Sequence, residues 1–445
     1  APLSLELNLL AGHIDGVLRF SFVEPHVKQV SRLVMNKEFR AKLGEVDPQI
    51  AREMIVPWLQ RSAQQKVVLP SDTGIGKFLD GFATVLRTNV AMQFMVGNVT
   101  NAAQQLTGII VAGTKVSPRH LTQGLYTYIM STKKTVQAIY EKSPWMSANQ
   151  DSNIYEVQGA INEILVNPSV FENTKNFAKA HTYFLQSFTQ NIVNSVVWQA
   201  GYNQAVEKGL SEVEAVRAAD SAVRLTQGTT NAEDISRYEV GTATQRLFTQ
   251  FAGYFNMLAN LNASEIQKIS KTMGLKRGAG KLFYLYAMGF AIPAILSEAI
   301  MIAGRGKGLD DDDDGYLDDL LALFFGSQAK TATAVIPYAG PLLNSAASRF
   351  NKVQYDDRLS YSPVLSVLES VAGVPAAIYK GVEKDEIKKQ TVKDSLMLLG
   401  VLSGLPIGPV GKPVGYTMDV QTGKANPTGP IDFARGIVTG QAGKN

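Results

Sequence analysis

The sequence has 445 residues, of which 45% are hydrophobic and 18% charged, so it is too apolar for an intrinsically disordered chain. Its formal net charge of +4, without any long Lys/Arg run, argues against a sequence-specific nucleic-acid binding module. The absence of cysteine excludes disulfides, thiolate metal sites and a cysteine nucleophile. At this length we expect two or three helical units, with some burial supplied by neighbouring copies or by lipid.

The first segment, residues 1–70, mixes short helical patterns with Pro25, Pro48 and Pro57. Each proline starts or stops a helix, so we expect short helices here. The chain begins Ala1-Pro2-Leu3 without an initiator Met or a signal-peptide pattern, so we expect a processed or trimmed start.

A soluble helical domain is expected over residues 71–275. From Ser71, apolar residues recur at helical spacing through Phe78, Phe82 and Val85 to Met95, which predicts a long, mostly buried helix. The amides that follow, bracketed by Gly97 and Gly108, suggest a break in the helix or a hydrogen-bonded layer between helices, with a ligand site as the alternative. These amides are Asn98, Asn101, Gln104 and Gln105.

Two further helices are expected in this domain. Ser211 and Glu214 form a capping-box pattern ahead of an apolar stripe, and Gly228 is suited to the helix end. The stripe consists of Ala215, Val216, Ala219 and Val223. Residues Thr242–Leu261 predict a helix with an aromatic face, which is more typical of a core or a subunit interface than of a cofactor site. This candidate interface consists of Leu247, Phe248, Phe251, Tyr254, Phe255 and Leu258.

An apolar helical region is expected over residues 276–411, and its longest apolar segment, Leu282–Ala303, is the best candidate for a transmembrane helix. Its length matches a hydrocarbon core of about 30 Å. Pro293 predicts a kink, and Glu298 lies near one end, where its insertion is less costly. A buried core helix is the alternative. The candidate membrane residues are Leu282, Phe283, Leu285, Phe290, Pro293, Ile295, Glu298 and Ile302.

An acidic loop follows this segment and imitates the start of an EF-hand. Asp310, Asp312 and Asp314 occupy the first, third and fifth positions, and Gly315 occupies the sixth. The twelfth position is Leu321 and not the bidentate Glu, so a solvated acidic turn within an apolar hairpin is the default and Ca²⁺ binding the weaker alternative.

The remaining apolar segments, near residues 334–343, 362–379 and 395–411, are interrupted by Pro or Gly. They are too short to span a bilayer and are typical of buried, re-entrant or interfacial helices. The Gly- and Pro-rich tail, residues 412–445, is expected to be irregular.

No constellation of residues predicts catalysis. The four histidines, His13, His26, His120 and His181, have no metal-ligand spacing, and no GxSxG motif is present. The segment Gly74-Ile75-Gly76-Lys77 lacks the leading glycine of a phosphate-binding loop, and Phe78 replaces its Ser/Thr. We therefore predict no catalytic residues, no cofactor and no metal site.

Several blocks after Ser71 resemble the C-terminal region of large internal virion (ejection) proteins and polyvalent proteins of short-tailed bacteriophages. The blocks are LRTNVAMQFMVGNVTNAAQQLTG, AADSAVRLTQGTTNAEDISRYEVGTATQRLFTQFAGYFNMLANL, SPVLSVLESVAG, LMLLGVLSGLPIGPVGKPVGYTMDV and DFARGIVTG. The resemblance implies a protein packaged in the capsid and ejected ahead of the genome. It also implies assembly with other ejection proteins into a conduit across the host envelope, and it supplies no catalytic residues.

Together these observations predict an all-α, elongated multi-helix assembly with apolar C-terminal helices able to enter a membrane. The expected partners are further copies of the chain, other virion core or ejection proteins, the host inner membrane and, without sequence preference, genomic DNA in transit. Two alternatives remain. One is a virion core subunit that never inserts in a membrane, and the other is a fragment of a larger peptidoglycan-cleaving or polymerase polyprotein.

Overall fold

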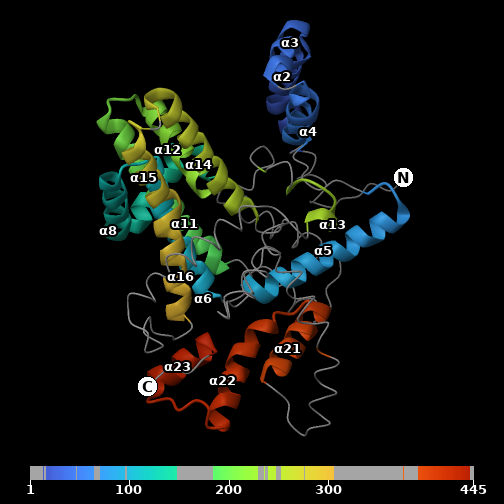
Figure 1. Ribbon diagram of the computed structural model, residues 1–445, viewed down its shortest axis with the longest axis vertical. Coiled ribbons are helices and arrows are strands. Elements are labelled where there is room, and N and C mark those ends of the chain that lie inside the picture. The colour runs from blue at the N-terminus through green and yellow to red at the C-terminus, as the bar shows by residue number, and fades with distance from the viewer. Residues whose placement is uncertain are drawn as a thin grey trace.

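The computed structural model describes residues 14, 17–46, 48–64, 71–95, 98–147, 184–228, 235, 239–246, 252–274, 276–304, 374 and 389–440. Most of these residues lie in helices, and no β-strand occurs among them. The predicted all-α class is therefore confirmed for the part of the chain that the structure describes. Figure 1 places the N-terminal helices and the C-terminal helices on opposite sides of a central group of helices.

The N-terminal helices share one small apolar cluster built around Val34, Ala51 and Leu59. Pro25 and Pro57 are the second residues of α2 and α4, each of which continues directly from a π-helical turn. The predicted short helices are confirmed. They are η1 (Arg19–Val23), α2 (Glu24–Met35), α3 (Lys37–Val46), η2 (Ile50–Ile55) and α4 (Val56–Gln64).

Helix α5 (Gly74–Met95) confirms the long helix predicted after Ser71, but the expectation that it is mostly buried is wrong. Its C-terminal half packs against α21 (Lys389–Ser403) through buried Leu86 and Val90. Its N-terminal half leaves an apolar row exposed, and we call this row the α5 stripe. It consists of Ile75, Phe78, Leu79, Phe82 and Val85. Apolar side chains with the same helical spacing are thus covered in the C-terminal half of α5 and exposed in its N-terminal half.

The central helices pack around α11 (Phe184–Glu207), which contacts both α8 (Pro118–Lys142) and α12 (Glu212–Gln227). Trp198 is fully buried in this core, and its ring stacks on Tyr202 with the centroids 5.2 Å apart. A Cβ added at Gly124 of α8 would lie 2.6 Å from the Val196 carbonyl oxygen of α11. Glycine at this crossing therefore allows the two helix backbones to approach closely.

Helix α12 begins and ends as its sequence predicts. The Ser211 backbone N–H and hydroxyl both donate to the Glu214 carboxylate, at 3.0 and 2.7 Å, and the helix closes at Gly228 with a φ of 72°. Three of the four stripe residues, Ala215, Ala219 and Val223, are completely buried. The capping box therefore starts a helix whose apolar face enters the core.

The predicted amide layer is confirmed in part beside α6 (Val99–Gln105), at Gln104. The side-chain oxygen Oδ1 of Asn98 accepts from the Asn101 N–H at 3.0 Å and caps this helix. Gln104 Nε2 donates to the carbonyl and hydroxyl oxygens of Ser297 on α16 (Ile292–Gly304), at 3.1 and 2.9 Å. Gln104 therefore joins two helices, Asn98 caps its own helix, and Gln105 Oε1 is buried without a hydrogen-bond partner among the described residues. The short helices α7 (Gly108–Val111) and η3 (Ala112–Thr114) follow.

The C-terminal helices bind α5 through two buried amides. Asn89 Nδ2 donates to the Val401 carbonyl at 2.8 Å. Gln93 Nε2 donates to the Leu405 carbonyl at 2.7 Å, and its oxygen accepts from the Gly408 N–H at the same distance. Gln93 thus satisfies partly buried backbone groups just beyond the end of α21.

The stretch from Lys412 contains two helices, so the prediction of an irregular tail is wrong. After η7 (Gly408–Val410) come α22 (Gly411–Gln421) and α23 (Pro430–Thr439). A Cβ added at Gly436 would lie 2.0 Å from the Tyr416 ring. This glycine allows close helix packing, which sequence composition alone does not separate from flexibility. The predicted domain limits at residues 70, 275 and 411 stay predictions.

Candidate functional site

The candidate membrane segment forms a continuous helical run of three parts, α15 (Ala279–Tyr286), the π-helical turn η5 (Ala287–Ala291) and α16. Within the described part of the chain, it contains the one helix, Ala279–Ser297, that is long and apolar enough to cross a membrane. Length and composition alone identify it, and a core helix of a soluble protein meets the same criterion.

This run has a packed face and an open face. Leu285, Ala291 and Ala294 are buried against the central helices. On the open face Phe283 is 72% exposed, and several further apolar side chains are exposed with it. These are Tyr286, Ile292 and Leu296. Because no charged residue occurs between Leu282 and Ser297, the open face carries no formal charge.

Close contacts hold the packed face against η3 and α14 (Ala252–Met273). A Cβ added at Gly289 would lie 2.8 Å from Asn262 Oδ1, and one added at Gly113 would lie 2.4 Å from Met288 Cε. The Tyr284 hydroxyl donates to the Gly113 carbonyl at 2.8 Å. Leaving this position for a bilayer would therefore separate well-fitted surfaces.

A change of helix type precedes Pro293, while the kink predicted at this residue stays a prediction. Proline lacks the N–H that would bond to the carbonyl four residues earlier, that of Gly289. The run passes through the η5 turn immediately before the proline, and Asn262 Nδ2 makes a long contact of 3.5 Å to the Gly289 carbonyl. The chain thus continues as a helix across the proline.

The structure separates the other predicted membrane residues by burial. Leu282, Phe290 and Ile295 are half-buried, and Pro293 is buried. Glu298 and Ile302 belong to α16, but their side chains lie outside the described part of the structure. Insertion of this segment in a membrane stays a prediction.

The predicted aromatic interface is described only at one end. Leu247, Phe248 and Phe251 lie outside the described residues, while Tyr254 and Phe255 belong to α14 without described side chains. Leu258 is buried beside Val111 and Leu261, so at this position the face joins the core. The short helix α13 (Ala243–Arg246) precedes it and contacts α5. The acidic loop at Asp310, Asp312 and Asp314 lies outside the described residues.

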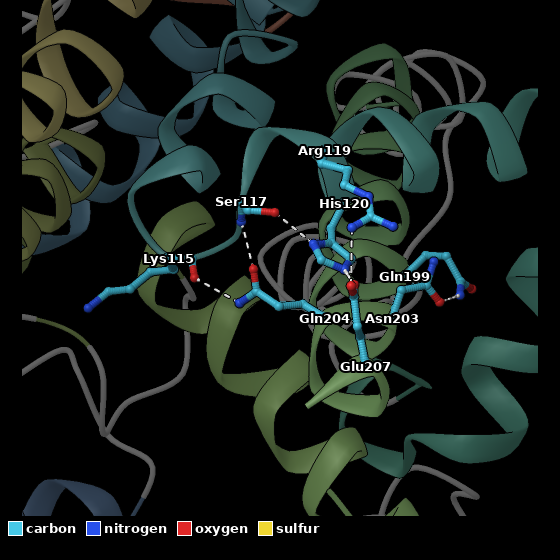
Figure 2. A network of polar contacts seen from close by, with 8 residues as sticks. All are labelled: Lys115, Ser117, Arg119, His120, Gln199, Asn203, Gln204 and Glu207. Atoms are coloured by element: carbon cyan, nitrogen blue, oxygen red, sulfur yellow. Dashed lines mark hydrogen bonds and ion pairs between the residues drawn. The ribbon is translucent and has the colours of Figure 1, made fainter. Parts of the chain in front are cut away.

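A polar network that the sequence did not reveal joins the start of α8 to the end of α11. Figure 2 shows His120 between Ser117 and Glu207. Its Nδ1 lies 2.6 Å from the Ser117 hydroxyl, and its Nε2 lies 2.5 Å from Glu207 Oε2. A carboxylate only accepts, so Nε2 carries the proton of this bond. Arg119 donates to the other carboxylate oxygen of Glu207 at 3.1 Å.

The same junction includes an amide bridge. The Ser117 N–H donates to Gln204 Oε1 at 2.7 Å, while Gln204 Nε2 points to the Lys115 carbonyl at 3.4 Å (Figure 2). The hydrogen bond from His120, followed by the charge of Arg119, holds the pKa of Glu207 below its ordinary value. We call Ser117, His120, Gln204 and Glu207 the α8–α11 clamp. No residue nearby in the sequence signals it, since Glu207 lies 87 positions after His120.

The order Ser–His–Glu resembles that of a hydrolytic triad, but its surroundings favour a structural clamp. Ser117 and His120 are three residues apart at the first turn of one helix, and His120 is buried. A hydrolase also needs donors for an oxyanion and a pocket for its substrate. His120 and Glu207 are instead bonded to side chains of the same two helices, which they join.

A second polar cluster joins α8, α11 and α12. Lys142 Nζ donates to Glu212 at 2.7 Å and to the Tyr202 hydroxyl at 2.8 Å, and that hydroxyl donates to Glu212 at 2.5 Å. Hydrogen bonding to Glu212 raises the pKa of Lys142, and the same bond lowers the pKa of Glu212. Asp220 accepts from Trp198 Nε1 at 2.7 Å and from the Ser143 hydroxyl at 2.6 Å.

Within the described residues no group of three or more His, Cys, Asp or Glu side chains is arranged to hold a metal ion. The polar groups described above are engaged in joining helices. Comparison of the chain with protein-family models, with curated proteins and with solved structures found no match.

Proposed function

We propose that this chain is a non-enzymatic structural protein of a bacteriophage virion, carried inside the capsid and released into the host envelope ahead of the genome. There it joins further copies and other ejection proteins in an elongated helical conduit. The proposal starts from the sequence blocks that resemble internal virion proteins. The structural observation that supports it most directly is the open apolar face of α15–α16.

Exposure of this face to water is unfavourable, at about 25 cal/mol for each Å² of apolar surface. A bilayer covers such a face without requiring a complementary protein surface. The packed face already satisfies its polar groups, as with the Tyr284 hydroxyl on Gly113 and Gln104 on Ser297. The open face can therefore enter lipid while the packed face keeps its contacts with the central helices. Alternatively, the packed face leaves the central helices and is then also covered by lipid.

A second candidate function is a virion core subunit that stays outside the membrane. The observation in its favour is the α5 stripe, which has the spacing by which amphipathic helices pack against other helices. In this case the exposed apolar side chains are covered by neighbouring subunits, and no lipid is involved.

Vesicle flotation combined with dye leakage tests the proposal. Wild-type protein should float with vesicles and release their dye, and Phe283→Glu/Leu296→Glu should lose most of the leakage. The reason is that a charge inside a bilayer is unfavourable, by about 2.5–3.5 kcal/mol at the centre and by less toward the ends of the span, where both residues lie. Val213→Glu is the matched control, because Val213 is an exposed apolar residue on α12.

Leakage that is equal in the double variant and the wild type would remove α15–α16 from the proposal. A closed, soluble oligomer that neither floats nor causes leakage would favour the core-subunit function. The oligomer's mass, measured in the same preparation, identifies that outcome.

A further inference from the structure

Helix α8 bends back on itself at Ser131, whose φ of −148° and ψ of 45° are not helical. The Thr135 hydroxyl lies 3.4 Å from the Thr127 carbonyl oxygen. In a straight helix residues eight apart are separated by about 12 Å along the axis. The two limbs, 118–130 and 132–142, therefore form a helical hairpin with Ser131 at its tip.

One side of each limb is fixed to the central helices. Leu121 in the first limb and Ile139 in the second are buried in the core around Trp198. The α8–α11 clamp holds the start of the first limb, and Lys142 holds the end of the second. The tip is thus carried on a base that these contacts hold, and Figure 1 shows α8 at the outer edge of the central group of helices.

The tip combines exposed apolar side chains with lysines. Tyr126, Ile129 and Met130 are 64, 66 and 64% exposed. Lys133 and Lys134 follow directly after the bend, and both are exposed. Neither lysine forms an ion pair with a residue that the structure describes, and the sequence from 118 to 140 contains no Asp or Glu.

We propose that this tip is a docking surface for an anionic lipid bilayer. Tyr126, Ile129 and Met130 enter the boundary between headgroups and acyl chains, and Lys133 and Lys134 bind headgroup phosphates. Apolar insertion and charge attraction together are the two contributions that hold peripheral helices on such membranes. The occupant follows from this charge complementarity.

Other partners fit this tip less well. Two lysines supply few phosphate contacts for nucleic acid. The phosphate backbone also offers no apolar surface against which Ile129 and Met130 could be buried. A second copy of the tip would bring like charges together. An anionic bilayer is the surface that rewards both the apolar and the cationic groups.

This inference rests on the proposed function in that both place the protein at a membrane, but it concerns binding at the surface and not insertion of α15–α16. The test measures affinity of the full chain for vesicles of phosphatidylglycerol and phosphatidylcholine. Lys133→Ala/Lys134→Ala should bind about 25-fold more weakly, since each surface lysine contributes roughly fivefold. Ile129→Ser/Met130→Ser should weaken binding about tenfold or more.

Lys268→Ala/Lys271→Ala is the matched control, because it removes two exposed lysines from one face of α14 and should leave the affinity nearly unchanged. Vesicles of phosphatidylcholine alone should bind weakly, and raising the salt should weaken binding to the anionic vesicles. Circular dichroism and the unfolding midpoint verify that each variant is folded.

Equal losses in the tip and control variants, or no loss in either, would overturn the docking surface. Binding of the wild-type protein to duplex DNA with the same affinity as to the anionic vesicles would also overturn it, in favour of nucleic acid. A wild-type dimer that is lost in the tip variants but kept in the control would overturn it in favour of a second copy. The Phe283→Glu/Leu296→Glu variant keeps the two proposals apart, since it should bind vesicles normally while losing leakage. If that variant binds normally and tip variants do as well, the docking surface fails while the insertion proposal stands.

Discussion

Helices α11 and α5 have 24 and 22 residues and both are rich in apolar side chains, yet their surroundings differ. Val193, Val196 and Val197 of α11 have no exposed surface, whereas Phe78 of α5 is 74% exposed. Small residues mark the difference. A Cβ added at Gly201 of α11 would lie 3.2 Å from the Ala219 backbone, while one added at Gly81 of α5 would meet nothing within 4 Å.

An apolar row on a helix therefore indicates that it is suited to being covered, and tightly packed small residues indicate that the cover comes from the same chain. Helix α11 meets both conditions. The N-terminal half of α5 meets only the first, which is the reason that its burial was wrongly expected. The following experiments can break or sharpen this comparison.

The largest expected difference is between two aromatic residues. Trp198→Ala should reduce the free energy of unfolding by about 3–5 kcal/mol, because it leaves a cavity and removes the hydrogen bond to Asp220. Phe78→Ala on the α5 stripe should change it by less than about 0.5 kcal/mol. Urea denaturation of both variants measures the contrast, and similar losses would mean that the stripe is covered in solution.

Two glycines give a smaller contrast of opposite sign. Gly124→Ala should destabilise the protein by about 1–3 kcal/mol, because the new methyl group meets the Val196 carbonyl oxygen. Gly81→Ala should stabilise it by about 0.4–1 kcal/mol, since the helix is open there and alanine restricts the unfolded chain. Thermal unfolding of the two variants provides the measurement. A loss of stability in Gly81→Ala would contradict the open environment.

The smallest effect concerns the pH dependence of the α8–α11 clamp. The pKa of Glu207 in the folded protein is lowered from 4.5, first by the hydrogen bond from His120 and then by Arg119. A lowered carboxyl pKa contributes stability that is present above 4.5 and is lost as the pH falls through the folded value. In Glu207→Gln the unfolding midpoint should therefore fall less steeply than in the wild type as the pH is lowered from about 5 to 3.

The matched control for the pH experiment is Glu38→Gln, an exposed substitution on α3 away from the clamp. The midpoint of this variant should keep the wild-type acid dependence. An unchanged acid dependence in Glu207→Gln would show that the clamp contributes nothing measurable to it.

Features set by neighbouring residues could be predicted from the sequence. Pro25 and Pro57 start helices, and Ser211 with Glu214 caps α12, because each acts within one helical turn. The amide layer at Gln104 was predicted from polar residues in an apolar run, although its partner Ser297 was not.

Features set by distant residues could not be predicted in this way. His120 and Glu207 are 87 residues apart, and Lys142 and Glu212 are 70 apart, so no spacing reveals either cluster. The Gly and Pro content of the tail predicts an irregular chain, whereas Gly436 within it accommodates the ring of Tyr416. A glycine in the sequence does not show whether a neighbouring side chain occupies the space that a Cβ would fill.

The two amides of α5 also bear on the order in which the chain folds. Gln93 is translated 312 residues before its partner Leu405, and Asn89 is equally far from Val401. At about 5–20 residues per second, ribosomal synthesis of that stretch takes roughly 15–60 s. During this interval the half of α5 that packs against α21 lacks that contact. A nascent chain therefore exposes this apolar surface of α5 before its own C-terminal helices can cover it.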